Sequence, residues 1–260
     1  MEASDFLTRL DTNSGRFEAS PLRRRLRRFF HVLVAFLPNG LKLVCYRYIF
    51  RFRIGRGVRI GLTVLDVDRC TLGDAVRIGH FNLFTRIKDL HIGDHVRVGF
   101  GNLFRGGSLL VLGRYCDLLR LNRINAIPEP DVIGTPEPVF VLGEGSVITA
   151  EHRFDFTDRI EIGKCAVIGG RNSSFWTHNR QATLPIHIGA FSYVGSEVRF
   201  APGAMIPSRC IVGLGSVVTG PIEEECSLIA GIPARVVRSL AESDLEMIGR
   251  KTRKDLPDDF

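Results

Sequence analysis

The sequence lacks the features that mark several common protein classes. Its six cysteines form no C-x-x-C pair, so a zinc ribbon or a thioredoxin motif has no support. The apolar segment Phe29–Leu37 has nine residues, whereas a membrane-spanning helix needs about 20. The first twenty residues are polar and mixed, which predicts no signal peptide. These absences, together with free thiols typical of a reducing compartment, predict a cytoplasmic protein.

Acidic residues are missing from one long stretch near the N-terminus. Residues 19–65 contain eleven Lys or Arg and no Asp or Glu, and the remaining chain holds 24 basic and 28 acidic residues. The formal net charge of +7 therefore belongs to this segment and not to the body. A local basic segment attracts anionic surfaces such as lipid headgroups. No recognised nucleic-acid-binding motif accompanies it, so no nucleic acid partner is expected.

What the sequence does contain is a period of six residues, in which aliphatic–glycine pairs recur. Thirteen such pairs lie largely in one frame: Ile54-Gly55, Ile60-Gly61, Leu72-Gly73, Ile78-Gly79, Ile92-Gly93, Val98-Gly99, Leu112-Gly113, Leu142-Gly143, Ile162-Gly163, Ile168-Gly169, Ile188-Gly189, Val194-Gly195 and Val212-Gly213. Four positions after each hexad begins, the residue is usually small, and Cys70, Cys116 and Cys210 take such positions. These thiols are therefore expected to be small buried groups.

A longer repeat of twenty residues is superimposed on the hexads. The segment Val76–Phe84 returns as Val96–Phe104, with an asparagine at the matching place in each. A proline-rich insertion, Ile127–Pro138, interrupts the later part of this repeat. The repeat predicts a ladder of polar residues, one in each coil: Asn82, Asn102, Asn122, His152 and Asn172.

Hexads of this composition fold as three short strands per turn, which together form a triangular coil. The aliphatic residue points inward and stacks on its counterpart one coil away, while glycine relieves crowding or takes a positive φ at the turn. Each coil buries its apolar row only against its neighbours, so several coils are needed. An α-helix would need apolar residues at a period of 3.6, which this region does not show. The sequence therefore predicts a mainly β protein built on a parallel β-helix.

The frame over residues 54–222 resembles the left-handed β-helix of the hexapeptide-repeat transferases. The segment Ile211–Arg238 resembles the closing motif of the maltose, galactoside and capsular-sugar O-acetyltransferases, roughly I-G-A-G-S-V-V-T-K-D-I-P followed by A-G-N-P-A-K-V-I-R. This resemblance implies an acetyl-CoA-dependent O-acetyltransferase that acts on a sugar hydroxyl of a bacterial surface polysaccharide or its precursor. It also implies a homotrimer with active sites between subunits.

Three regions are expected along the chain: a basic, amphipathic helical segment over 1–53, the β-helix over 54–222, and an extension over 223–260. The extension is expected to carry a helix over Val236–Lys251. Within the first region, Pro21–Phe50 predicts one or two helices, with five arginines ahead of the apolar run. Residues 21–53 could lie on the inner face of an anionic membrane. The alternative is a helix that caps the open end of the β-helix, with its arginines solvated.

The hexads break between Asn172 and Pro185, and a loop that leaves a rigid coil is a common place for function. By resemblance, Thr177-His178 corresponds to the T-H motif whose histidine is the general base. An imidazole that titrates near neutral pH can take the proton of a sugar hydroxyl as it attacks a thioester. The alternative for His178 is a structural loop residue. By the same resemblance, the amide of Ser196 is the candidate donor to the oxyanion.

Further candidate residues are assigned by their position relative to His178 and Ser196. His152, Glu151, Asn172 and Trp176 are candidates for contact with the acceptor, and the alternative for His152 is a hydrogen-bonded ladder residue. The positions that match the CoA-binding region of the family are Tyr193, Gly203, Gly213, Gly215, Ser216, Thr219 and Arg235. The chain departs from the family pattern where Gly220 replaces lysine and Leu214 replaces a small residue. These departures leave open a different CoA placement, a weaker affinity or a longer acyl group.

Other functions occur on the same fold. A γ-type carbonic anhydrase needs two histidines five residues apart on one coil, whereas Thr157 and Thr183 stand five places after His152 and His178. No metal is therefore expected. Amino-sugar N-acylation and a non-catalytic β-helix that acts as a scaffold or binding module remain as alternatives.

Overall fold

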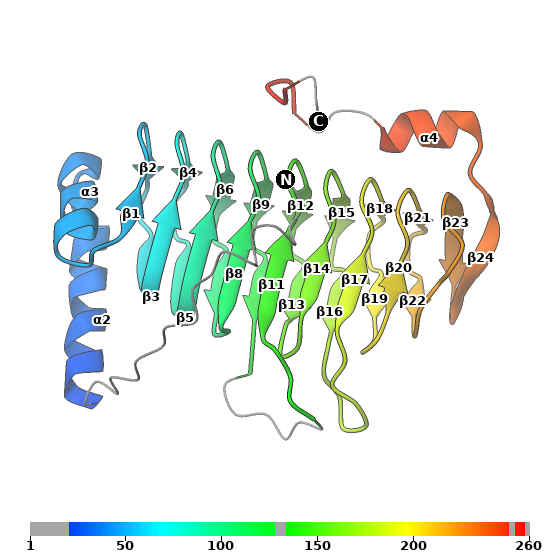
Figure 1. Ribbon diagram of the computed structural model, residues 1–260, viewed down its shortest axis with the longest axis horizontal. Coiled ribbons are helices and arrows are strands. Elements are labelled where there is room, and N and C mark those ends of the chain that lie inside the picture. Colours follow the sequence, from blue (N-terminus) through cyan, green and yellow to red (C-terminus); the bar gives the residue numbers. More distant parts are fainter. Residues whose placement is uncertain (1–20, 128–133, 250–252, 258–260) are drawn as a thin grey trace.

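The hexads form the sides of a triangular coil, and the coils stack into a left-handed parallel β-helix (Figure 1). This computed structural model describes residues 21–127, 134–249 and 253–257, so half of the insertion 127–138 lies outside the described residues. Parallel strands on one side, from β2 (Arg59–Ile60) to β23 (Ser227–Gly231), mark about nine coils. The predicted fold class is confirmed, including its N-terminal helical segment and a short C-terminal helix.

Each coil contributes strands to three faces, which we call A, B and C in chain order. Face A comprises β1 (Arg53–Ile54), β8 (Leu109–Leu112), β11 (Val139–Leu142), β14 (Ile160–Ile162), β17 (Ile186–Ile188) and β20 (Met205–Ile206). Face B comprises β2, β4 (Arg77–Ile78), β6 (Arg97–Phe100), β9 (Asp117–Arg120), β12 (Val147–Ala150), β15 (Val167–Arg171), β18 (Tyr193–Val194), β21 (Ile211–Val212) and β23. Face C comprises β7 (Leu103–Arg105), β10 (Arg123–Asn125), β13 (Arg153–Asp155), β16 (Ser174–Trp176), β19 (Arg199–Phe200) and β22 (Val217–Val218). The long strands β3 (Val64–Leu72) and β5 (Leu83–Ile92) run from face C into face A.

The interior is filled by apolar rows that follow the coil axis. On face B the first aliphatic residue of each hexad is buried, as the period of six predicts. On face C the row is largely aromatic: the Phe84 and Phe104 rings stack at 4.2 Å, and the Phe154, Phe175 and Phe200 rings stack in turn at 4.4 and 4.5 Å. Identical side chains stacked one coil apart fill a core of constant width, which explains why the register repeats.

A ladder of buried polar side chains lines the inside of the corner between faces B and C, the B–C corner. Asn82 Oδ1 accepts the Asn102 N–H at 2.9 Å, and Asn102 Oδ1 accepts the Asn122 N–H at 3.0 Å. Asn122 Oδ1 accepts the His152 N–H at 3.0 Å, and His152 Nδ1 accepts the Ser173 N–H at 3.1 Å. The ladder satisfies one buried backbone donor in each coil, which a corner without a regular strand would otherwise leave unpaired.

The ladder corrects one prediction, because its fifth member is Ser173 and not Asn172. Ala150 pairs with Arg171 where an unbroken register would pair it with Gly170, so β15 carries one extra residue. The extra residue is a β-bulge, and it shifts the ladder position forward by one. Asn172 instead takes the turn position before the ladder, with φ +61° and an exposed side chain.

Two helices close the N-terminal end of the β-helix: α2 (Pro21–Ala35) and α3 (Asn39–Tyr48) (Figure 1). The Lys42 ammonium donates to the carbonyls of Ile60, at 3.1 Å, and Gly61, and Asn39 Oδ1 accepts the Ile60 N–H at 2.9 Å. These side chains satisfy the open strand edge of the first coil, which could otherwise pair with another chain. No helix that the structure describes is both long and apolar enough to cross a membrane.

The C-terminal end closes with an antiparallel strand. The predicted helix Val236–Lys251 is wrong over its first residues, because β24 (Ala234–Ser239) pairs with β23. The helix α4 (Glu242–Ile248) follows, and Lys251 lies outside the described residues. An aliphatic run that completes a strand edge gains ladder hydrogen bonds that a helix could not offer there, so tertiary pairing overrides local propensity.

Candidate functional site

The predicted site residues gather at two different corners of the coil. At or beside the B–C corner lie Glu151, Asn172, Tyr193, Ser196, Gly213, Gly215 and Ser216. At or beside the corner between faces C and A, the C–A corner, lie Trp176, His178, Gly203 and Thr219. Face C separates these two groups in a single chain.

His178 stands in a loop that leaves the coil after β16. The backbone of His178 pairs with that of Thr183 in an antiparallel bridge, and the Leu184 N–H donates to the Thr177 carbonyl at 2.9 Å. At the tip, Asn179 Oδ1 accepts two backbone N–H groups, at 2.7 and 2.8 Å. The loop is therefore a small, hydrogen-bonded hairpin, and it holds a half-buried imidazole outside the coil stack.

Two further features distinguish this loop. Trp176, at the end of β16, is 44% exposed and precedes the loop directly. Thr183 Oγ1 is buried and has no hydrogen-bond partner among the described residues. Unsatisfied buried hydroxyls are rare and mark sites that accept another group or carry function. Neither feature could be read from the hexad pattern, which gives no information on segments that interrupt it.

His152 is fully buried and belongs to the ladder. Its Nδ1 accepts the Ser173 N–H, so the neutral ring carries its proton on Nε2, which donates to Thr149 Oγ1 at 3.0 Å. Burial lowers the pKa of His152 to about 4. This geometry favours the ladder alternative for His152, because the ring has no exposed atoms with which to contact an acceptor. Glu151 beside it has φ +62° and a half-buried side chain.

Ser196 lies where β18 turns into β19. Its Oγ accepts the Arg171 N–H at 3.3 Å, and its carbonyl accepts the Gly215 N–H at 3.0 Å. For the Ser196 N–H itself, the described residues provide no hydrogen-bond acceptor. A side chain on Gly170 would meet Ser196 Oγ at 1.7 Å, so the bulge needs glycine there. The bulge glycine is a residue that sequence reasoning missed, since it falls inside an ordinary aliphatic–glycine hexad.

The B–C corner continues from Ser196 into the next coil. A Cβ on Gly195 would lie 3.1 Å from the Leu214 nitrogen, which shows how closely the two coils approach. Leu214 is 73% exposed, and Gly215 has φ +70°. Ser216, by contrast, is buried, and its hydroxyl donates to the Gly213 carbonyl at 2.7 Å. Its side chain therefore stabilises the turn and is not free to contact a ligand.

The remaining predicted cofactor residues are spread more widely. Tyr193 covers Gly169, where a Cβ would lie 2.7 Å from the tyrosine hydroxyl oxygen. Gly203 has φ +80° and lies under Leu184 of the loop that carries His178. Thr219 is exposed where β22 ends. Arg235 is exposed on β24 and pairs in register with Ala230, whose Cβ would lie 3.3 Å from a Cβ on Gly213.

Ser196 and His178 lie at opposite edges of face C. Ser196 is bonded to Arg171, before β16 begins, whereas His178 follows the end of that strand. Each strand residue between them adds roughly 3.3 Å to their separation along the face.

Within the described residues, no group of three His, Cys, Asp or Glu side chains is arranged to hold a metal ion.

Similarity to known proteins agrees with this architecture. The chain matches no model of a known protein family. It is 37% identical over 62 residues to the galactoside O-acetyltransferase of Escherichia coli (strain K12), a match that spans 24% of this chain and only 30% of that protein. The UDP-N-acetylglucosamine acyltransferase from Campylobacter jejuni has the same fold, with a TM-score of 0.55 and 16% identity over 76% of this chain and 77% of that one. The chain is thus a hexapeptide-repeat protein with a left-handed β-helix, similar to the acyltransferases built on that repeat.

Proposed function

We propose that this protein is an acetyl-CoA-dependent O-acetyltransferase whose acceptor is a sugar hydroxyl of a bacterial surface polysaccharide or its precursor. The observation that carries the proposal is His178, held by a hydrogen-bonded loop outside an otherwise regular coil. The partial similarity to a galactoside O-acetyltransferase supports the same reaction class. His178 takes the hydroxyl proton while the oxygen attacks the thioester carbonyl, and CoA leaves as the thiol.

The attack creates an oxyanion, which needs a donor at the place where charge develops. The Ser196 N–H suits this role, because no acceptor among the described residues competes for it. We place the pantetheine arm beside Tyr193, Gly213 and Gly215, where the exposed Arg235 is available for a phosphate of CoA. Leu214 projects into the same region, so the acyl or pantetheine group must pass beside it.

The separation of the two corners supports a homotrimer. His178 from one copy and the Ser196 N–H from its neighbour would complete a site that neither copy completes alone. A cyclic assembly uses the same pair of surfaces three times, which suits two different edges of one coil stack. Light scattering tests this part, and a monomer would contradict the site.

The decisive experiment measures thiol release from acetyl-CoA over a panel of bacterial surface saccharides. We expect acceptor-dependent release by the wild-type protein and a loss of about 10²-fold or more in His178→Ala, the effect expected for a general base. His187→Ala is the matched control, because His187 is a half-buried histidine on β17, outside the candidate site. Equal loss in both variants would contradict the role of His178. No release with any acceptor or acyl-CoA would favour a binding module.

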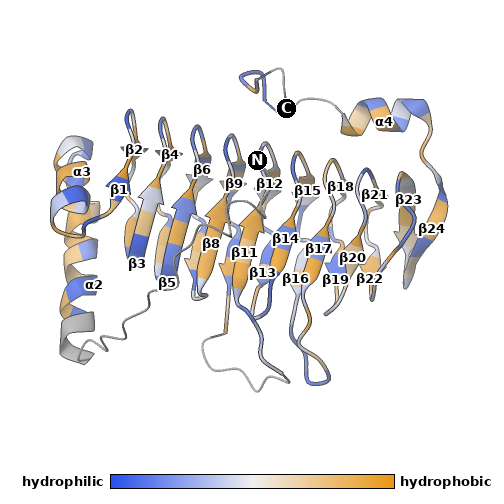
Figure 2. Cartoon of the chain, viewed as in Figure 1, coloured by the Kyte–Doolittle hydropathy of each residue, from blue (hydrophilic) through white to orange (hydrophobic). Residues whose placement is uncertain are grey.

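We also propose that the N-terminal helices touch an anionic membrane face. The buried side of α2 packs on the coil, yet its outer side exposes an apolar stripe with a helical period, Leu26, Phe29, Phe30 and Leu33, and the exposed Phe36 follows directly after the helix. Leu41, Val44 and Tyr48 continue the exposed surface on α3. Figure 2 shows these two helices at the end of the coil stack, away from the candidate site. Large exposed apolar patches on a basic segment are typical of interfacial helices.

Sedimentation with vesicles tests the membrane contact. We expect recovery with vesicles that contain phosphatidylglycerol, weaker recovery with pure phosphatidylcholine, and a loss on adding salt. Phe29→Gln/Phe36→Gln should reduce recovery strongly, whereas Leu119→Gln/Leu121→Gln, two exposed leucines of the body, should not. Equal recovery with neutral and anionic vesicles would contradict the proposal.

A further inference from the structure

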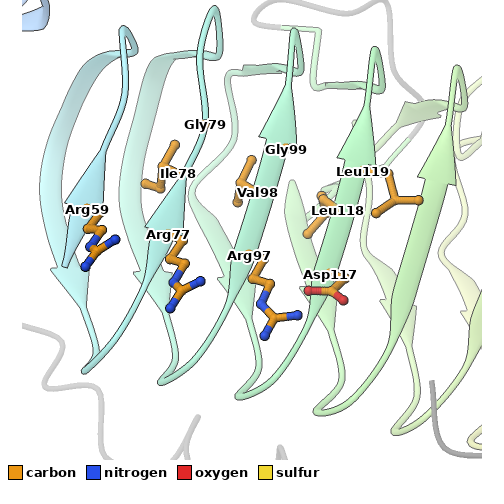
Figure 3. Close-up of a pocket in the computed structure, with 10 residues that line it drawn as sticks. All are labelled: Arg59, Arg77, Ile78, Gly79, Arg97, Val98, Gly99, Asp117, Leu118 and Leu119. Carbon is orange, nitrogen blue, oxygen red and sulfur yellow. The ribbon is translucent and has the colours of Figure 1, made fainter. Parts of the chain in front are cut away.

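Three arginines stand in a row on the outside of face B. Arg59, Arg77 and Arg97 pair in register on three successive strands, β2, β4 and β6, and Figure 3 shows their side chains in line. Neighbouring strands lie about 4.8 Å apart, so Arg59 and Arg77 face only like charge along the row, whereas Arg97 has Arg77 on one side and Asp117 on the other. Like charges directly opposite one another destabilise a sheet. The row therefore costs stability unless something anionic lies along it.

Some charged side chains on neighbouring coils face a residue of opposite charge. Arg114 pairs with Glu144 of the next coil at 2.8 Å, and Arg69 pairs with Asp89 in the same way. By contrast, the side chains of Arg59 and Arg77 form no ion pair or hydrogen bond with any residue that the structure describes. Arg59 and Arg77 therefore have no counter-charge among the described residues, although each has an arginine as its neighbour on the next strand.

A hollow of about 420 Å³ lies beside the row. Its floor is backbone, because Ile78 and Val98 point into the core and the outward positions next to them are Gly79 and Gly99. In the following coil Leu119 replaces the glycine and closes the hollow at one end. We call this the arginine groove: Arg59, Arg77, Arg97, Gly79, Gly99 and Leu119.

The protein already places a carboxylate on one end of the row. Asp255 pairs with Arg97 at 2.7 Å. The chain is fixed there by Arg253, whose side chain is 3% exposed and donates to the carbonyls of His95 and Tyr115 at 2.8 and 3.1 Å. Arg97 is thus satisfied by the C-terminal segment, while the adjoining guanidinium groups stay open to an anion from outside.

We propose that the arginine groove binds an extended, multiply charged anion, namely an acidic or phosphorylated segment of the saccharide acceptor. That the anion belongs to the acceptor rests on the proposed function, whereas anion binding by the groove does not. Four coil steps separate β6 from β18, which is roughly 20 Å along the axis. A ligand that reaches both places must be a polymer. Planar guanidinium groups one coil apart suit carboxylates or phosphates repeated along such a chain.

Calorimetry on the full chain tests the groove with two probes, oligogalacturonate for carboxylates and tripolyphosphate for phosphates. We expect salt-dependent binding of at least one probe, and the probe that binds names the anion. Arg59→Gln/Arg77→Gln should weaken that binding by about tenfold, through loss of two charge-assisted contacts. The matched control is Arg123→Gln/Arg153→Gln, another exposed arginine pair stacked in register, on face C and outside the groove.

Three results would overturn the proposal. One is that the wild-type protein binds neither probe, and another is that both double variants weaken binding equally, which would indicate non-specific charge. The third is a smaller mass of Arg59→Gln/Arg77→Gln in light scattering, which would assign the row to a contact between copies. Thiol release with a small neutral sugar is measured separately, so failure of the groove and failure of the acetyltransferase assignment are distinguishable.

Discussion

The B–C and C–A corners of the coil are built in different ways, and this difference decides where the chain departs from regularity. At the B–C corner the buried ladder from Asn82 to Ser173 ties each coil to the next. Among the described residues the C–A corner has separate side-chain bonds, in which Thr157 Oγ1 accepts the Ile127 N–H and Thr177 Oγ1 accepts the Asp158 N–H, but no continuous ladder. This corner contains continuous strand in β3 and β5, the insertion 127–138, and the loop that carries His178.

A corner whose buried side chains form a continuous hydrogen-bonded ladder accepts only small changes in the length of the chain that passes it. Its irregularity is the one-residue bulge at Gly170. A corner without a continuous ladder can accommodate inserted segments, because loop closure costs little extra with length. The candidate base accordingly stands on the permissive corner, and the candidate oxyanion donor stands on the rigid one.

The largest expected effect comes from combining one defect at each corner. His178→Ala and Ser196→Pro, which removes the amide N–H, should each be nearly inactive. In mixed trimers about a quarter of the interfaces would pair an intact histidine with an intact amide, so co-expression should restore about a quarter of the wild-type rate of thiol release. A site closed within one chain would give no recovery.

Insertions compare the two corners directly. Gly-Ser inserted after Leu121 should break the ladder between two coils and lower the free energy of unfolding by about 3 kcal/mol or more, since buried polar groups lose their partners. The same dipeptide after Gln181, at the exposed loop tip, should cost under about 1 kcal/mol. Urea unfolding measures both. Equal costs would show that the ladder does not fix the corner.

Single side chains give a smaller contrast. Asn122 donates to the Thr149 carbonyl at 3.0 Å and accepts the His152 N–H, so Asn122→Ala should cost about 2–3 kcal/mol of unfolding free energy. Thr183→Val removes a buried hydroxyl that has no partner among the described residues, so it should be neutral or slightly stabilising. The midpoint of thermal unfolding should fall in Asn122→Ala and stay the same or rise slightly in Thr183→Val. A loss on Thr183→Val would contradict this account of the loop.

The smallest change in unfolding free energy at neutral pH is expected from His152→Asn, which introduces the amide side chain found at three other ladder positions. The folded-state pKa of His152 is about 4, below its ordinary 6.5, so the unfolded chain binds more protons between these values. Stability is therefore full above pH 6.5 and falls toward pH 4, by up to about 1.4 kcal/mol per pH unit. His31, with its pKa also lowered to about 4 by burial, adds a parallel loss.

Unfolding curves at several pH values between 7 and 4 measure this slope. The fall of unfolding free energy with decreasing pH should be less steep in His152→Asn than in the wild type. The remaining fall should be the part that His31 contributes. An unchanged slope would mean that His152 does not titrate across folding.

The coil itself could be predicted because its information is local. Every aliphatic–glycine hexad specifies a short strand and a turn, and thirteen of them in frame leave few other folds. The ladder was predicted correctly from Asn82 to His152, because the insertion before His152 is large enough to be recognised in the sequence. Asn172 was misplaced because a single inserted residue is invisible to a count made in sixes. The strand β24 was mistaken for helix because its partner edge lies elsewhere in the sequence.

The sequence by itself determined the repeat, the stacked core and the loop that breaks the frame at His178. Only the tertiary structure decided which corner each candidate residue occupies, that His152 is sealed inside, and that three arginines stand in one row beside a glycine floor. The physical reason is that a hexad encodes its own turn through neighbours in sequence. The contacts that make a site join residues one or more coils apart, and their alignment depends on every insertion between them.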